Sequence, residues 1–355
     1  MEYYAFVLGE PNPGSTDGES IEELLDEIKG ADLGGFTGCF FAEHHNDRRQ
    51  SLTSRPNLLI AAAARETRRL RLGTMVTVLG LHQPFIIAEE IATLDNLSKG
   101  RIEYGIGAGG FGWNQLGIDR SSAKDRLEEG VTLIQRLFAE GQTGEISYQG
   151  QYWSGTAARI VPSCVQQPHP PFWITGHGDD TIERAARLKT SFCTGFVSCE
   201  TVSARRDFYQ RAWSRYHRHE PPGRTGHMIL VAVGDSRRDV RERALPAMRT
   251  KLFEFAKATL GKRGDPSFTF EQALRDRYGV SSWDELIEAG IVVHGTAEDC
   301  IEQLEQIRER GGDALLMQPR FADIDRSFSR ESFLRLAQEV LPRVGTVSGD
   351  LVSAP

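Results

Sequence analysis

The 355-residue sequence lacks the features that mark membrane, disulfide-stabilised and nucleic-acid-binding proteins. No apolar run approaches the roughly 18 residues of a membrane-spanning helix, and the first residues carry no signal-peptide pattern. The five cysteines are odd in number, scattered and without a C-x-x-C pair, so neither a disulfide framework nor a zinc knuckle is indicated. The formal net charge of -7 argues against a polyanionic partner. We therefore expect a cytoplasmic protein that acts on small molecules, without a nucleic acid or membrane partner.

The composition is that of a folded α/β chain. Hydrophobic residues make up 39% and charged residues 26% of the sequence, which is ordinary for a protein with a sizeable core. Short apolar runs alternate with longer amphipathic stretches, the pattern of a parallel sheet with crossover helices. The predicted strands are residues 3–8, 36–42, 70–78, 101–106, 172–175, 192–197, 228–233 and 314–317, and the predicted helices are 20–33, 52–67, 84–97, 122–138, 180–189, 203–217, 298–310 and 331–340. Eight strands in alternation favour a (β/α)8 TIM barrel over an open doubly wound sheet.

The chain is longer than the ~250 residues of a typical barrel of this kind, and two segments that break the alternation account for the excess. Residues 141–171, an insertion after the fourth helix, are rich in turns and contain no clear helix. Residues 246–290, an insertion after the seventh strand, are charged and irregular in pattern, as active-site lids often are. We expect one barrel domain over residues 1–344 and a flexible tail over 345–355.

The carboxyl ends of the strands should carry the chemistry of such a barrel. After the second strand come Glu43, His44 and His45. Adjacent residues of an extended strand point to opposite faces, so the two histidines should not bind one metal together. Because acidic partners are also sparse, we expect no metal site. One of the histidines should face the barrel mouth, where it is either catalytic or a structural group of the core.

The segment from Gly105 to Gly110 matches G-x-G-x-x-G, the fingerprint of dinucleotide-binding sites. It follows the fourth strand rather than the first, and a loop separates it from its helix, so we reject that interpretation. Two explanations stay open. The glycines form a tight barrel turn, or they let a flat or phosphorylated ligand approach the backbone closely.

A phosphate site is indicated after the fifth strand, where Gly176, His177 and Gly178 precede a helix. Backbone N–H groups at the start of a helix bind anions. The two aspartates that follow argue against this site, because they would repel a phosphate if they faced it. His177 or Thr181 would then supply the compensating donor.

Several ordered segments at these positions resemble the bacterial-luciferase-like flavin-dependent monooxygenases. The segments that carry the resemblance are residues 41–45, 72–84, 94–101, 166–171 and 293–298. The resemblance implies a two-component monooxygenase that takes reduced FMN from a separate flavin reductase, reacts it with O2 through a flavin C4a-hydroperoxide and oxygenates a small apolar organic substrate. It also implies a homodimer, formed through the helices after the second and third strands, where the alanines at 61–64 permit close approach.

Two alternatives stay open on the same barrel. One is a deazaflavin-dependent oxidoreductase that transfers hydride without oxygen, and the other is a non-catalytic flavin-binding protein. The segment Glu43-His44-His45 points away from the first, and His44 together with the long second insertion disfavours the second.

The resemblance implies roles for individual residues. His44 matches the catalytic histidine of the family, and His45 would be its supporting neighbour. Met75 and Val76 fall where the family often has a bulge or a non-prolyl cis peptide beneath the flavin ring. The ring and ribityl chain would lie against Gly107, Ala108, Gly109 and Gly110, and the phosphate against Gly176, His177, Gly178 and Thr181.

The sequence departs from the luciferases proper at two of these positions. Ala108 stands where they carry an arginine for the phosphate, and Gly107 where they carry a reactive cysteine. Residues 246–290 correspond to a mobile active-site loop that would exclude water. The apolar residues expected around the substrate, with barrel packing as the alternative, are Phe6, Phe111, Trp113, Phe196 and Met228.

Overall fold

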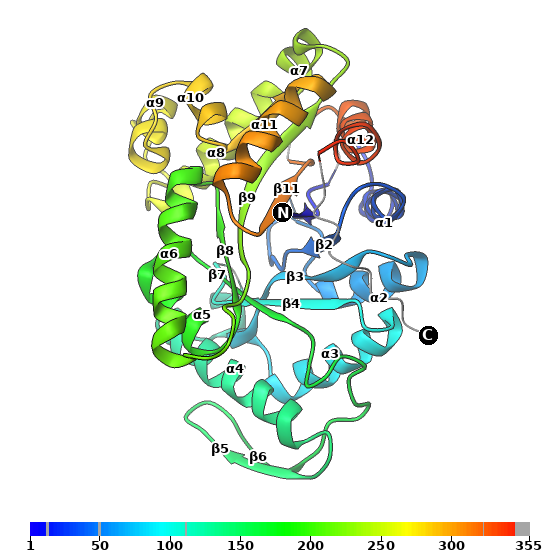
Figure 1. The fold of residues 1–355 in the computed structure, drawn as a ribbon, viewed down its shortest axis with the longest axis vertical. Coiled ribbons are helices and arrows are strands. Elements are labelled where there is room, and N and C mark those ends of the chain that lie inside the picture. Colours follow the sequence, from blue (N-terminus) through cyan, green and yellow to red (C-terminus); the bar gives the residue numbers. More distant parts are fainter. Residues whose placement is uncertain (12–13, 49–50, 111, 322, 345–355) are drawn as a thin grey trace.

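Eight parallel strands close into a barrel in the computed structural model, which describes residues 1–11, 14–48, 51–110, 112–321 and 323–344 (Figure 1). In their order around the ring the barrel strands are β1 (Glu2–Val7), β2 (Gly38–Phe41), β3 (Arg71–Val78), β4 (Ile102–Gly107), β7 (Phe172–Thr175), β8 (Ser191–Gly195), β9 (Thr225–Val233) and β11 (Ala314–Gln318). The ring is closed because β11 pairs with both β9 and β1. The predicted (β/α)8 TIM barrel is confirmed.

Helices cover the outside of the barrel (Figure 1). They are α1 (Asp17–Leu33), α2 (Pro56–Glu66), α3 (Pro84–Ser98), α4 (Ala123–Glu140), α5 (Asp179–Arg187), α6 (Cys199–Tyr216), α11 (Ala297–Arg310) and α12 (Arg326–Arg335). Thr16 and Thr296 begin α1 and α11 with capping boxes. The helix predicted from residue 52 begins later, at Pro56, because the residue before a proline avoids the helical region. Within the described ranges, no helix is long and apolar enough to cross a membrane.

The first insertion, residues 141–171, contains an antiparallel hairpin that the sequence pattern does not predict. Its strands are β5 (Ile146–Gln149) and β6 (Ser154–Ala158). The turn between them is held by Glu129 of α4, whose carboxylate accepts hydrogen bonds from the backbone N–H groups of Gln151, Tyr152 and Trp153. Because most residues of both strands are partly or fully exposed, the apolar alternation that reveals a strand is missing.

The second insertion, residues 246–290, is mostly helical, so the irregular structure expected from its sequence is wrong. Its elements are α8 (Leu245–Thr259), α9 (Phe270–Ala273), a π-helical turn (Leu274–Tyr278) and α10 (Trp283–Glu288), and a short helix, α7 (Arg237–Arg243), precedes them. Met248, Leu252 and Ala256 are buried at intervals of four residues in an apolar cluster with the end of β9. Charged residues between these positions and the glycines after α8 conceal the helical pattern.

A ninth strand, β10 (Val292–Gly295), is also absent from the sequence-based prediction. It lies outside the ring and pairs with the carboxyl-terminal half of β9, from Leu230 to Val233. The first half of β9 therefore pairs with the barrel strands β8 and β11, and its second half pairs with β10. The predicted flexible tail at 345–355 lies outside the described residues.

The amino-terminal end of the barrel is filled by a buried ion cluster around Glu103 of β4. Its carboxylate pairs with Arg71 and Arg224 and accepts a hydrogen bond of 2.7 Å from Trp173 Nε1. Burial raises the pKa of Glu103, but the charges of Arg224 and Arg71 outweigh it and lower the pKa below its usual value. This cluster occupies the amino-terminal end of the barrel, opposite the end where the sequence predicts the site.

His227 of β9 is fully buried, and neither ring nitrogen has a hydrogen-bond partner among the described residues. Burial lowers its pKa from 6.5 to about 4, so the folded protein holds it neutral. The unfolded chain binds a proton in this range that the folded chain does not, so the stability that depends on neutral His227 is present above pH 6.5 and is lost as the pH falls toward 4.

We predict that His227→Leu weakens this pH dependence. Between about pH 8 and about pH 5 the wild type should lose about 2 kcal/mol more of its unfolding free energy than the variant, because leucine binds no proton. Urea unfolding at both pH values measures this difference, with the exposed His219→Leu as the control. Equal losses in the wild type and His227→Leu would show that His227 does not titrate on unfolding.

Candidate active site

The Glu43 carboxylate is the centre of a hydrogen-bonded group at the carboxyl end of the barrel. It accepts hydrogen bonds from the backbone N–H of Val78 at 2.9 Å, from His45 Nε2 at 2.7 Å and from His82 Nε2 at 2.8 Å. Burial raises the pKa of Glu43, but the hydrogen bonds from His45 and His82 outweigh it and lower the pKa to about 2. Glu43 is therefore ionised at neutral pH, and it orients the two histidines rather than donating a proton itself.

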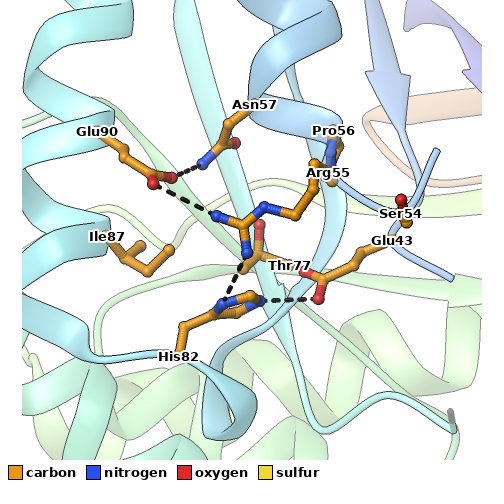
Figure 2. Close-up of a pocket in the computed structure, with 9 residues that line it drawn as sticks. All are labelled: Glu43, Ser54, Arg55, Pro56, Asn57, Thr77, His82, Ile87 and Glu90. Atoms are coloured by element: carbon orange, nitrogen blue, oxygen red, sulfur yellow. Dashed lines mark hydrogen bonds and ion pairs between the residues drawn. The ribbon is translucent and has the colours of Figure 1, made fainter. Parts of the chain in front are cut away.

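His82 connects this group to a network between α2 and α3 (Figure 2). Arg55 Nη1 lies 3.4 Å from His82 Nδ1, and Glu90 lies 3.5 Å from Arg55 and accepts a hydrogen bond from Asn57. Because a guanidinium only donates, Nδ1 accepts and the proton of His82 sits on Nε2, toward Glu43. The pocket that these residues line has room for about one water molecule, so it is part of the support for Glu43 rather than a substrate site.

The predicted catalytic histidines follow Glu43 directly. His45 is the partner of Glu43, and its ring packs against the loop after β4, where a methyl group added at Gly112 would lie 3.0 Å from His45 Cδ2. His44, which lies between Glu43 and His45 in the chain, is half-buried. The role of His82 as a second donor to Glu43 was not predicted from the sequence. Among the residues that the structure describes, no group of three or more His, Cys, Asp or Glu could hold a metal ion.

The peptide bond between Met75 and Val76 is cis, and the pairing of β3 with β4 shifts register between Thr74 and Thr77. The resemblance implied a bulge or a non-prolyl cis peptide at this position, and the structure has both. Two glycines of β4 let it approach this bulge, because a methyl group at Gly105 would lie 2.2 Å from the carbonyl oxygen of Thr74 and one at Gly107 would lie 2.6 Å from Val76.

The two explanations left open for the glycine-rich segment therefore apply to different residues. Gly105 and Gly107 are required by the packing of the barrel strands. A methyl group at Gly110 would meet no atom within 4 Å, so the backbone there is open to a ligand. Gly109 has a φ of 60°, which favours glycine. Ala108, between Gly107 and Gly109, is half-buried.

The sequence predicts an anion site at the start of α5. Gly178 is the N-cap and contributes no side-chain hydrogen bond, so the first N–H groups of the helix are not capped by it. Thr181 packs against Gly176, where a methyl group would lie 2.7 Å from Thr181 Cγ2. Asp180 faces this helix start, since a methyl group at Gly178 would lie 2.6 Å from Asp180 Oδ1, but its charge is offset by an ion pair of 2.6 Å with Lys124 of α4.

His177, between these glycines, lies among positive charges. Its Nδ1 is 3.3 Å from Thr194 Oγ1, which also accepts a hydrogen bond from Arg205. Burial and the charges of Arg277 and Arg205 lower the pKa of His177 to about 4. His177 is therefore neutral at neutral pH. The two arginines belong to α6 and to the second insertion, and their approach to His177 is a tertiary contact that no sequence motif signals.

The apolar residues predicted for the substrate are divided among clusters. Phe6 lies inside the barrel with Met75, Val76 and Met228. Phe196 belongs to the cluster of the second insertion, on which Met228 also packs. Trp113 is 2% exposed in a separate cluster against the start of α4, so it is not brought together with the others. Phe111 lies outside the described residues.

We predict that Glu43→Gln destabilises the protein by about 2 kcal/mol at neutral pH, because the hydrogen bonds from two histidines lose their charged acceptor. Urea unfolding measures the change, with the exposed Glu22→Gln of α1 as the control. The stability due to ionised Glu43 is present above pH 4.5 and is lost as the pH falls toward about 2, so wild type and variant should converge there. If the urea midpoint of Glu43→Gln equals that of Glu22→Gln at neutral pH, the stabilising role of Glu43 is contradicted.

Known proteins resemble this chain in sequence and in fold. The oxygenase component of flavin-dependent trigonelline monooxygenase from Acinetobacter baylyi is 32% identical over 194 residues, which cover 53% of this chain and 52% of the relative. The oxygenating constituent of 3,6-diketocamphane monooxygenase from Pseudomonas putida, solved in complex with FMN, superposes with a TM-score of 0.78 at 18% identity, over 97% of this chain and 99% of that one.

A second fold neighbour uses a different cofactor. An F420-dependent secondary alcohol dehydrogenase, in complex with an F420-acetone adduct, superposes with a TM-score of 0.74 at 17% identity, over 97% of this chain and 99% of that one. At these identities the two superpositions show the fold alone. The sequence profile described as luciferase-like monooxygenase matches residues 1–314. This chain therefore belongs to the luciferase-like monooxygenase family of oxidoreductases.

Proposed function

We propose that the protein is the oxygenase component of a two-component monooxygenase, which takes reduced FMN from a separate reductase and uses O2 to oxygenate a small organic substrate. One observation carries the proposal. The bulge with the cis peptide Met75–Val76, the open backbone at Gly110 and the start of α5 all lie at the carboxyl end of the same barrel. A flat ring with a phosphorylated side chain needs such a combination of an apolar floor, a close backbone and an anion site.

The residues present fit FMN. Met75 and Val76 would support the ring, and the segment from Gly107 to Gly110 would lie along it. The phosphate would accept hydrogen bonds from the backbone N–H of Gly178, from His177 and from the Thr181 hydroxyl. Gly176 would lie against it without donating, because its backbone N–H already donates to the carbonyl oxygen of Cys193. Lys124, which is held at the start of α5 by Asp180, supplies a positive charge there in place of the arginine that Ala108 replaces.

Bound reduced FMN would supply two electrons to O2, so that one oxygen atom enters the substrate and the other leaves as water. His44 would face the reacting atoms and hold or deliver a proton there. Glu43 acts through its neighbours, because it fixes His45 and His82 and so the chain segment that carries His44. The helices of the second insertion would cover the site and exclude water. Phe6 and Met228 would contact the apolar part of the substrate.

The relatives support this choice without deciding the cofactor. The trigonelline monooxygenase relative is named as an oxygenase component, and the diketocamphane enzyme was solved with FMN. The F420-dependent neighbour has the same fold, so hydride transfer from a deazaflavin is the competing function.

We predict that the protein binds photoreduced FMN under anaerobic conditions about tenfold or more tightly than reduced riboflavin, because only FMN carries the phosphate that the start of α5 would hold. Titration calorimetry measures both affinities, and reduced F420 is the third ligand. On mixing with air-saturated buffer, bound reduced FMN should be oxidised more slowly than free reduced FMN. Tighter binding of F420 would favour hydride transfer, and FMN bound with no effect on its oxidation would favour a non-catalytic flavin-binding protein.

We also propose a homodimer through α2 and α3. Two large apolar side chains on these helices are solvent-exposed, Leu58 at 71% and Ile86 at 47%. We predict that the double variant Leu58→Glu and Ile86→Glu is monomeric in light scattering coupled to gel filtration, whereas the wild type is dimeric. Val161→Glu, which changes an exposed valine in the first insertion, is the control. A wild type that elutes as a monomer would contradict this interface.

A further inference from the structure

Arg205 and Arg277 are half-buried guanidinium groups without a carboxylate partner among the residues that the structure describes. Arg205 donates to Thr194 Oγ1, and Arg277 Nη2 donates to the carbonyl oxygen of Gly195 at 3.1 Å. Over the described ranges neither arginine forms an ion pair, although the largely buried Arg224 and Arg320 are each paired with glutamate. Each guanidinium has five N–H donors, so most of the donors of Arg205 and Arg277 remain for another acceptor.

The neighbouring charges do not neutralise the positive charges of the two guanidinium groups. Burial and the charge of Arg277 both lower the pKa of Arg205, which places two like charges near each other. Asp179 acts on Arg205 electrostatically and partly offsets this repulsion, but it forms no ion pair with it among the described contacts. Burial also lowers the pKa of Arg277. Half-buried like charges of this kind are stable when an anion lies between them.

Both guanidinium groups lie at the end of the barrel where the flavin would bind. Their acceptors, Thr194 and Gly195, are the last residues of β8. A methyl group at Gly195 would be 3.9 Å from both His177 and Met228, which is an ordinary van der Waals distance, so the backbone of Gly195 is not tightly packed against these residues. The arginines therefore flank the residues to which the proposed function assigns the phosphate and the substrate.

Aromatic rings lie beside Arg277. The guanidinium of Arg277 stacks over the ring of Phe255 at 5.1 Å, and Phe255 meets Phe196 edge to face at 4.8 Å. Stacking fixes the plane of the guanidinium and leaves its N–H edge free for two parallel hydrogen bonds. An oxyanion on an apolar or aromatic body matches both parts of this surface.

We infer that Arg205 and Arg277 form an oxyanion site that binds the carboxylate of an organic-acid substrate, with the apolar body of that substrate against Phe255 and Phe196. This inference rests on the proposed function for the position of the flavin and deepens it by naming the substrate class. The flavin phosphate has its own donors at the start of α5 and at Lys124. Arg277 comes instead from the second insertion, the segment that would cover the substrate.

The test compares carboxylates with their neutral amides on the purified full-length protein without flavin. Calorimetry measures the binding of benzoate and hexanoate, and of benzamide and hexanamide as uncharged counterparts. We expect at least one carboxylate to bind about tenfold or more tightly than its amide, and Arg205→Gln and Arg277→Gln each to abolish most of this preference. The controls are Arg211→Gln on α6 and Arg275→Gln beside Arg277, both exposed, which should bind like the wild type.

Other outcomes overturn the inference. Equal binding of acids and amides by the wild type would show that no oxyanion site exists, and this measurement needs no variant to fold. If the arginine variants lose affinity for FMN but not for riboflavin, while carboxylate binding is unchanged, the arginines hold the cofactor phosphate instead. Because carboxylate binding is measured without flavin, it can fail while FMN binding succeeds, which separates this inference from the proposed function.

Discussion

The Glu43 carboxylate bonds at once to the backbone of β3 and to histidines from two loops. The bond to Val78 fixes the end of the strand whose bulge carries the cis peptide, and the bonds to His45 and His82 fix the segments on either side of it. A buried carboxylate without these donors would be costly to ionise, so the three donors and the charge depend on each other. The ion cluster around Glu103 closes the opposite end of the barrel in the same way. Each end of the barrel thus has one buried carboxylate that binds several neighbouring segments. Only Glu43, at the carboxyl-terminal end, lies beside the proposed flavin site.

The barrel was predictable, because the alternation of strands and helices is a local property of the chain. The same alternation gives the carboxyl ends of the strands, where we propose the site. The bulge at Met75 and Val76 was expected from resemblance alone, and the structure confirms its geometry. The helices of the second insertion were missed because their apolar positions become a pattern only once β9 is present to bury them. Arg205 and Arg277 were missed for a related reason. Nothing distinguishes them from other arginines of the sequence until folding removes them from any carboxylate partner.

The glycine-rich segment after β4 shows how one motif serves two purposes. Its first residues let two strands approach, and its last leave the backbone accessible. A sequence pattern cannot separate these roles, since both require the same small residue. Likewise the charge of Asp180, which argues against an anion site, is offset by its ion pair with Lys124. In both cases the partner residue, and not the residue itself, decides the role.

The division of β9 between two neighbours has a consequence for how such a protein changes over generations. Its first half is locked into the ring by β8 and β11, while its second half, with β10, anchors helices that have an apolar core of their own. Met228 packs on both this second core and the cluster inside the ring, and the other residues of the two cores are distinct. The packing of the ring can therefore be inherited almost unaltered while most of the sequence of these helices changes.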